Sequence, residues 1–280
     1  MTESIQGTLD AERILAGMKP ATRSSLTSLV VHHEVDSTNS ELLRLPSDQL
    51  HASAVIADHQ TSGRGRRQRS WHSPPGGNIY LSLGWQLNPH GWPLSTFPLV
   101  VALAVGQALG RAGLRGHGIK WPNDILCNGK KLAGILVEMQ STGSGPAMAV
   151  IGVGLNVKMP GRDLDRLTAV IDRPWTDLDS ELNAEAHGDS VRVNRNELTS
   201  LLLSELIESI GFFETSGFEV FRPAWSDLDL LRGENVSLNY NGRQVAGIAA
   251  GVDRDGGLLL QTATDGIQVF HAGEVSLHRE

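Results

Sequence analysis

The densest group of charges in the chain is an arginine loop, residues 63–69, which reads Gly-Arg-Gly-Arg-Arg-Gln-Arg. Guanidinium groups match the oxygens of phosphate and carboxylate groups, and glycine lets the backbone come close to a ligand. The loop therefore predicts an anion site, and a solvated surface loop is the equally weighted alternative. Gln68 stands where a dinucleotide fingerprint needs its third glycine, and no Walker A sequence occurs. A nucleotide bound here would need another scheme.

A second group of polar residues runs from Lys120 to Asp124 and continues after the turn Asn128-Gly129 to Lys131. The turn predicts a hairpin that brings both ends of this segment together. A lysine in a cleft can neutralise charge on a phosphoryl oxygen, and Asp124 could hold Mg²⁺, which prefers oxygen ligands. Spacing alone favours the simpler interpretation, a surface hairpin with exposed lysines.

Two further segments have both a structural and a functional interpretation. Thr38 and Glu41 form a capping box at the start of a helix, which explains the segment 36–41, although Ser37 and Thr38 could also offer hydroxyl groups to a ligand. Gly152 and Gly154 interrupt an apolar strand. Such glycines indicate either close approach of a ligand or tight packing of the sheet.

The elements that would position these residues follow from the hydrophobic pattern. Strands are expected at 52–57, at 78–85 with one face buried, at 125–127 and 132–139 around the hairpin turn, and at 149–157. A short helix should follow Asp10. The apolar segment 97–109 is shorter than the roughly 20 residues needed to span a bilayer, so we expect a buried helix and no membrane association.

The last third of the chain changes character twice. Residues 160–192 have weak periodicity and are expected to be irregular or partly helical. Asn194 and Glu197 resemble a capping box before a leucine-rich helix. From Gly233, short strands are separated by Asn241-Gly242 and by residues 255–257, which predicts a small β-barrel. We expect a large domain at 1–230 and a small one at 231–280.

Composition narrows the function. The 280 residues carry a net charge of -7, which argues against non-specific binding to nucleic acid or anionic membranes. The single cysteine, Cys127, excludes an internal disulfide, and the ten histidines show no metal-binding spacing. No apolar leader is evident, so a cytoplasmic protein is expected. About thirty residues before Val30 leave little room for a DNA-binding module, so we expect none.

Taken together and in order, the motifs resemble those of biotin protein ligases, from residue 36 to the C-terminus. The matching segments are Ser37-Thr38-Asn39, the arginine loop through Trp71, residues 120–124, residues 131–134 and Gly154-Leu155-Asn156. The resemblance implies an α+β fold: a mixed β-sheet catalytic domain with helices, similar to class II aminoacyl-tRNA synthetases, followed by an SH3-like β-barrel. It also implies the monofunctional form of the family.

The resemblance further implies a two-step reaction. The carboxylate of biotin would attack the α-phosphate of ATP, and a lysine of a biotin carboxyl carrier domain would then displace AMP from biotinyl-5'-AMP. Mg²⁺ would accompany ATP, and the enzyme would be a monomer or weak homodimer.

The resemblance also assigns residues to each role. The biotin-binding residues would be Ser37, Thr38, Asn39, Gln60, Gly63, Arg64, Arg66, Lys131, Gly134 and Gly154. The ATP-binding residues would be Arg66, Arg69, Trp71, Asn123, Asp124, Lys131 and Asn156. Lys131, Arg66 and Asp124 would be catalytic, with Asp124 the candidate metal ligand. Gln68 departs from the family, which commonly has glycine there, and this puts the closing geometry of the loop in question.

Three other functions compete with biotin ligation. A lipoate or octanoate protein ligase would share the scaffold but would need an apolar channel in place of hydroxyl and amide groups. A nucleic-acid-binding protein could use the arginine loop and the barrel, although few aromatic residues are present to stack on bases. A biotin-storing protein would bind biotin without catalysis.

Overall fold

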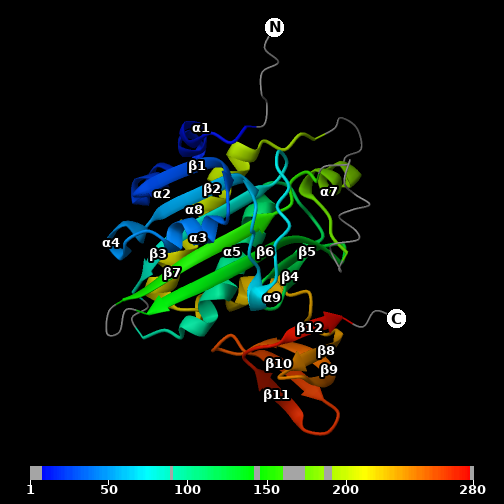
Figure 1. The fold of residues 1–280 in the computed structure, drawn as a ribbon. Helices are drawn as coiled ribbons and strands as arrows, with labels where there is room; N and C mark the ends of the chain where they lie inside the picture. Colours follow the sequence, from blue (N-terminus) through cyan, green and yellow to red (C-terminus); the bar gives the residue numbers. More distant parts are fainter. Residues whose placement is uncertain (1–7, 89–90, 142–145, 160–173, 186–190, 278–280) are drawn as a thin grey trace.

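The computed structural model describes residues 8–88, 91–141, 146–159, 174–185 and 191–277. Two β-sheets make up its framework, one of seven strands and one of five (Figure 1). The small sheet lies beyond one end of the large one, next to the helices that cover the large sheet (Figure 1).

The large sheet is mixed, as expected. Its strands, in spatial order, are β1 (Ser28–Val35), β2 (Ser53–Gln60), β3 (Ile79–Leu87), β7 (Ala147–Leu155), β6 (Lys130–Ser141), β5 (Asp124–Cys127) and β4 (His117–Lys120). The pair β1 and β2 is parallel, and the other neighbours are antiparallel. Residues 160–173 and 186–190 of the segment predicted to be irregular lie outside the described part, and α7 (Leu178–Glu185) lies between them.

Strand β3 corrects one expectation, because it is buried on both faces and not on one. All its residues are buried except Gln86, which is partly exposed. Helix α8 packs against one face and α3 against the other. The polar residues that suggested an exposed face are used inside the protein: the Tyr80 hydroxyl donates to the carbonyl of Pro74 at 2.9 Å, and Ser82 is fully buried.

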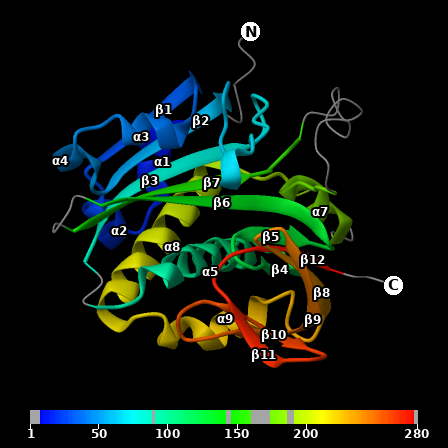
Figure 2. The ribbon, with the colours of Figure 1, turned by 60° about the horizontal axis from the view of Figure 1, so that its bottom comes forward.

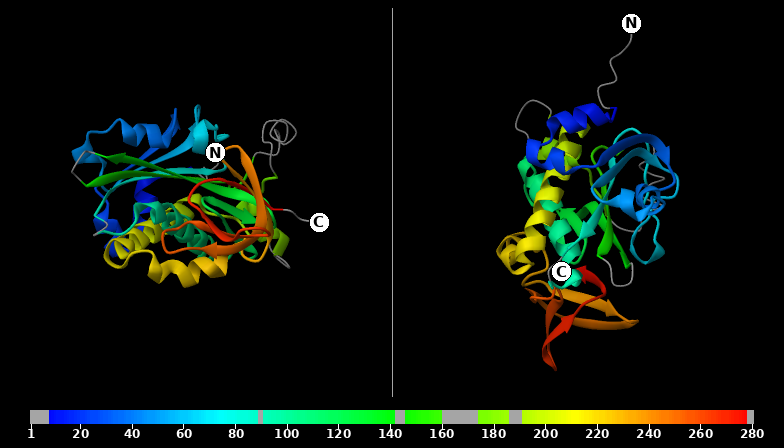
Figure 3. Two further views of the ribbon diagram at one scale, coloured as in Figure 1. Left: turned by 90° about the horizontal axis from the view of Figure 1, so that it is seen from below. Right: turned by 90° about the vertical axis from the view of Figure 1, so that its left-hand side faces the viewer.

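Helices α1, α2, α5, α8 and α9 form a layer on one face of the large sheet (Figures 2 and 3). Helix α5 (Phe97–Arg111) packs on β4, β5 and β6, and α8 (Arg195–Ser216) packs beside it and against β3. The other helical segments are α1 (Ala11–Gly17), α2 (Pro20–Ser25), α3 (Thr38–Leu43), α4 (Ser47–Leu50), α9 (Arg222–Leu228), η1 (Arg66–Gln68), η2 (Leu94–Thr96) and η4 (Glu219–Phe221). Both α1 and α2 pack on α8, whereas α3 lies on the opposite face of the sheet.

Helix α5 is the buried core helix that the sequence predicted. In the described part of the chain, one stretch, Leu94–Arg111, is long and apolar enough to cross a membrane by composition, and 67% of it is buried inside the molecule. Such burial fits the position of α5, which packs against both the large sheet and α8.

Local signals placed several boundaries correctly. Asp10 caps α1 by accepting from the backbone N–H of Arg13, and Asn194 caps α8 by accepting from Asn196 and Glu197. The hairpin turn between β5 and β6 has Asn128 and Gly129 at φ 50° and 76°. Asparagine and glycine reach such positive φ values at low cost, so this dipeptide determines the turn.

The small sheet is antiparallel and begins where the change in pattern predicted it. Its strands, in spatial order, are β11 (Gly266–Phe270), β10 (Leu258–Thr262), β9 (Arg243–Val252), β8 (Asn235–Tyr240) and β12 (Glu274–Leu277). The division into domains at residues 230 and 231 stays a prediction. The turn 255–257 docks on the large unit, where the Trp121 indole N–H donates to the carbonyl of Gly256 at 3.0 Å.

Replacing the α8 cap tests how much this helix contributes. Asn194→Ala removes the acceptor for two backbone N–H groups and should lower the free energy of unfolding by about 1 kcal/mol. Urea denaturation would measure it, with Asn194→Ser as the control that keeps a capping oxygen. Equal stability of the alanine and serine variants would contradict this role.

Candidate active site

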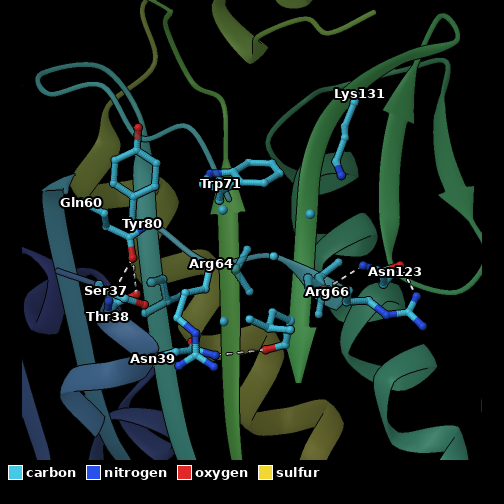
Figure 4. Close-up of a pocket in the computed structure, with 18 residues that line it drawn as sticks. Ser37, Thr38, Asn39, Gln60, Arg64, Arg66, Trp71, Tyr80, Asn123 and Lys131 are labelled. Carbon is cyan, nitrogen blue, oxygen red and sulfur yellow. Dashed lines mark hydrogen bonds between the residues drawn. The ribbon is translucent and has the colours of Figure 1, made fainter. Parts of the chain in front are cut away.

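The site is built on the face of the large sheet that α3 covers. Side chains alternate between the two faces of a strand, so residues paired across strands share a face. Ser82 pairs with Gly152, and Gly134 pairs with Gly154. The three glycines, with Leu136, line the floor of a cavity, whose labelled side chains are drawn in Figure 4.

The glycines of this floor are needed for close approach. A Cβ atom on Gly152 would lie 2.4 Å from Oδ1 of Asn39, and one on Gly154 would lie 2.5 Å from Cε2 of Trp71. A Cβ on Gly134 would lie 2.8 Å from the same indole. The glycines thus allow α3 and the segment after the arginine loop to rest on bare strand backbone.

The start of α3 corrects the capping-box interpretation. The N-cap is Ser37, which makes no side-chain cap hydrogen bond, and Thr38 is the first helical residue. The Thr38 hydroxyl instead lies 3.2 Å from Oε1 of Gln60 and 2.7 Å from the Ser82 hydroxyl. Side chains in this segment therefore face the cavity and do not cap the helix.

Gln60 is held from both ends, so the orientation of its amide is fixed. Its Oε1 accepts from the backbone N–H of Thr38 at 2.9 Å, and its Nε2 donates to the Ser73 hydroxyl at 2.9 Å. The result is a buried polar end of the cavity, formed by α3, β2 and the segment after the arginine loop.

Arg64 and Asn39 meet at a carboxylate that sequence reasoning missed. Glu138 of β6 accepts from Nδ2 of Asn39 at 2.8 Å and forms an ion pair with Arg64. The Arg64 guanidinium also donates to the Ser40 hydroxyl at 3.2 Å. The Arg64 side chain therefore connects α3 to β6. Figure 4 shows it beside Asn39.

The rest of the arginine loop points toward the other end of the site. Arg66 donates to Oδ1 of Asn123 at 2.7 Å (Figure 4). Burial lowers the pKa of Arg66, the charge of Arg67 lowers it further, and Asp124 opposes both. A buried guanidinium remains protonated, so Arg66 favours an incoming anion.

Arg67 and Arg69 contact the small sheet through one carboxylate. Arg69 binds both oxygens of Glu274, at 2.9 and 2.6 Å, and Arg67 lies 3.7 Å from it. Gln68, between them, has φ 61°, and Arg67 has φ 56°. Gln68 thus adopts the left-handed conformation that glycine would adopt freely, at a cost of about 1 kcal/mol.

Lys131 lies at the start of β6, where the hairpin returns it to Asp124. Its ammonium is 2.9 Å from Oδ1 of Asp124 and 5.1 Å from the ring centroid of Trp71. The hairpin is therefore not a surface feature with exposed lysines at this position, since Lys131 borders the cavity. Asn156 is fixed beside it, because its Nδ2 donates to the carbonyl of Thr176 at 3.0 Å.

Two cavities divide the predicted ligand-binding residues. An inner one of ≈ 60 Å³ is lined by every predicted biotin-binding residue except Gly63. An outer one of ≈ 760 Å³ is lined by Gly63 and by every predicted ATP-binding residue. The residues shared by both are Gln60, Gly65, Arg66, Trp71, Asn123 and Lys131. The structure thus brings the predicted set together, and the individual roles stay predictions.

Several residues of the site were missed because their signal is tertiary. Ser73, Ser82 and Glu138 contact predicted residues, and Glu274 lines the outer cavity from the small sheet. Trp175 lines the same cavity beside Lys131, whose backbone bonds to Pro174 and Thr176. Nothing in the weakly patterned segment 160–192 indicated this contact.

Metal and thiol chemistry find little support elsewhere in the described residues. No group of three or more His, Cys, Asp or Glu side chains could hold a metal ion there. Cys127 is buried in β5. Asp124 can offer a carboxylate to a cation, but as a single ligand that is already paired with Lys131.

The contact between Glu274 and the arginine loop can be tested by proteolysis. Glu274→Gln removes the charge that holds Arg67 and Arg69, so trypsin should cut the loop a few-fold faster, since a partly exposed ion pair contributes at most about 1 kcal/mol. Glu234→Gln, an exposed carboxylate just before β8, is the control. Equal rates of cleavage in the two variants would show that Glu274 does not restrain the loop.

Two protein families match this chain. Residues 31–156 match the Biotin/lipoate A/B protein ligase family, and residues 232–278 match the Biotin protein ligase C terminal domain. The first match includes the floor glycines, the arginine loop and Lys131, and the second covers all of the small sheet.

Curated relatives and a solved structure agree with these matches. The chain is 34% identical to the Bifunctional ligase/repressor BirA of Escherichia coli, over 89% of this chain and 74% of that protein. It is 36% identical to a biotin--[acetyl-CoA-carboxylase] ligase of Paracoccus denitrificans, over 86% and 96% of the two chains. A biotin protein ligase from Aquifex aeolicus, solved with biotin and ATP, superposes with a TM-score of 0.73 at 30% identity, covering 91% of this chain and 100% of that one. The chain therefore belongs to the biotin protein ligase family of enzymes.

Proposed function

We propose that this enzyme uses ATP to attach biotin to one lysine of a biotin carboxyl carrier domain, through biotinyl-5'-AMP. The observation that carries the proposal is the pair of adjoining cavities whose shared wall includes Arg66 and Lys131. One substrate would occupy each cavity, and their reacting groups would meet at these two cations.

The inner cavity suits the head group of biotin. Its closed end has the hydroxyls of Ser37 and Thr38 and the amide of Gln60, all buried. A ureido ring has two N–H donors and one carbonyl acceptor, and burying it requires a partner for each. A lipoyl or octanoyl chain would offer no hydrogen-bond partner to the sides of these groups that face the cavity, which disfavours the lipoate alternative.

The inner cavity has room for only a few water molecules, because the Trp71 ring lies across Gly134 and Gly154. We propose that biotin displaces this ring toward the outer cavity, which Trp71 also lines. There the indole ring would stack on the adenine ring of ATP.

The first step forms a bond between a biotin carboxylate oxygen and the α-phosphorus of ATP and breaks the bond to the β-phosphate, so that pyrophosphate leaves. Two anions must approach each other for this attack. Arg66 and Lys131 would offset their repulsion and stabilise charge on the α-phosphate oxygens. Lys131 would exchange Asp124 for phosphate as ATP binds.

In the second step the amine of an acceptor lysine attacks the acyl carbon, an amide forms and AMP leaves. The nitrogen must lose a proton, which would pass to water, and Asp124, which lines the outer cavity beside Lys131, would orient the amine once Lys131 has turned to phosphate. The acceptor we propose is the carrier domain of a biotin-dependent carboxylase, which agrees with the name of the Paracoccus relative. The reaction would take place in the cytoplasm, where ATP is available, in a monomer or weak dimer.

Mg²⁺ is proposed to arrive with ATP. Magnesium in nucleotide sites commonly has one or two protein carboxylates and several phosphate oxygens as ligands, so Asp124 fits as its single protein ligand here. The ion would neutralise part of the triphosphate charge.

Removal of Mg²⁺ tests this proposal. Chelation by EDTA should stop adenylate formation, and excess MgCl₂ should restore it. Full adenylate formation in EDTA would exclude a role of Mg²⁺ in the reaction.

Adenylate formation is the direct test of the proposal. The protein is incubated with biotin, Mg²⁺ and α-labelled ATP, and biotinyl-5'-AMP is separated and counted. We expect product with biotin and not with lipoate, and a loss of roughly 10²–10³-fold in Lys131→Ala, since one preorganised charge on the transition state disappears. Lys130→Ala, an exposed neighbour outside both cavities, should retain wild-type activity. If folded wild-type protein formed no biotinyl-5'-AMP, the proposed function would be contradicted.

A further inference from the structure

Glu138 is a carboxylate that neither cavity includes, yet it contacts two residues of the inner one. It accepts from Nδ2 of Asn39 at 2.8 Å and pairs with Arg64, and its side chain is 23% exposed. Asn39 is 3% exposed and lines the inner cavity. The Glu138 carboxylate can therefore influence the inner cavity through its hydrogen bond with Asn39.

The charge of Glu138 fixes the orientation of the Asn39 amide. An ionised carboxylate only accepts hydrogen bonds, so it selects the NH₂ group of Asn39. The carbonyl of Leu136, 3.5 Å from the same nitrogen, favours the same orientation. The amide oxygen must then face Ser82, whose hydroxyl is within hydrogen-bond distance.

The orientation of Asn39 decides where the buried hydroxyl protons go. Ser82 has one proton, and the Asn39 oxygen can only accept, so Ser82 donates to Asn39 and not to Thr38. The oxygens of Thr38 and Ser82 are 2.7 Å apart and need a proton between them, so Thr38 donates to Ser82, although Oε1 of Gln60 also lies 3.2 Å away. The Thr38 proton is thus used inside the protein, and its oxygen is left as an acceptor for an N–H group in the cavity that Thr38 lines.

We propose that Glu138 is a positioning residue that makes the closed end of the inner cavity a hydrogen-bond acceptor, through Asn39, Ser82 and Thr38. Resting on the proposed function, this role gives the enzyme selectivity for a ring with N–H donors, the ureido ring of biotin. Arg64 offsets the charge of Glu138 on its solvent side and is not part of this relay.

Glu138→Gln tests the relay. A neutral amide can turn its NH₂ toward Asn39, which then flips and donates to Ser82. The Ser82 proton moves to Thr38 and occupies a lone pair needed by the ligand. The KM for biotin in adenylate formation should rise roughly tenfold, the loss of one hydrogen bond, while the KM for ATP stays unchanged. Wild type should prefer biotin over a biotin that is methylated on its ureido nitrogens. In Glu138→Gln, the ratio of the KM values for these two compounds should be smaller than in wild type.

The matched experiment moves the carboxylate to the other partner. In an Asn39→Asp background both residues are acidic and repel each other. Adding Glu138→Gln there restores a donor facing an acceptor, and the introduced carboxylate still accepts from Ser82. The same substitution should therefore raise the KM for biotin beside the native asparagine and lower it beside the introduced aspartate. A merely structural role of Glu138 would give the same sign in both backgrounds.

Two controls complete the experiment. Glu138→Asp keeps the charge and should keep the selectivity for biotin. Glu41→Gln removes another carboxylate of α3, one that pairs with Arg44, and should not reduce the selectivity. An unchanged KM in Glu138→Gln, the same sign in both backgrounds, or an equal loss of selectivity in Glu41→Gln would overturn the inference. Equilibrium binding of biotin without ATP separates it from the proposed function: wild type that binds biotin but forms no adenylate contradicts the function, and the Kd values of the variants still test the relay.

Discussion

Bare strand backbone at Gly134, Gly152 and Gly154 is the constraint on which the site depends. With no side chain at these points, Asn39 and the Trp71 ring can rest directly on the sheet. Contact at that distance places the start of α3 against β3 and β7, so that hydroxyls and amides from distant segments share one buried network. A methyl group at any of the three would push these contacts apart, and the polar end of the inner cavity would lose its geometry.

The cations of the site are held by acceptors that they can exchange. Arg64, Arg66 and Lys131 contact Glu138, Asn123 and Asp124 respectively, and each acceptor comes from a strand or turn of the large sheet. Repulsion within the arginine loop is thus offset before a ligand binds. Arg67 and Arg69 use Glu274 of the small sheet for the same purpose, which makes the C-terminal unit part of the environment of the outer cavity.

Features encoded by neighbouring residues could be predicted from the sequence, and those that depend on distant ones could not. The hairpin at Asn128, the cap at Asn194 and the buried helix α5 follow from local rules. The motif set also placed Lys131, Arg66 and Thr38 in one site. Burial of both faces of β3 required knowledge of what packs on each face. Glu138 is 74 residues from Arg64, and Glu274 is 205 from Arg69, so no spacing pattern connects them.

Trp71 belongs to the walls of both cavities, and this has a thermodynamic consequence. A ligand that moved its ring would change the shape of the adjoining cavity, so the two binding equilibria would be linked. Linkage is reciprocal: whatever factor the first ligand applies to the affinity of the second, the second applies to the first. One indole on a glycine strip would then be enough to make two separate binding events cooperative, without any movement of the sheet beneath it.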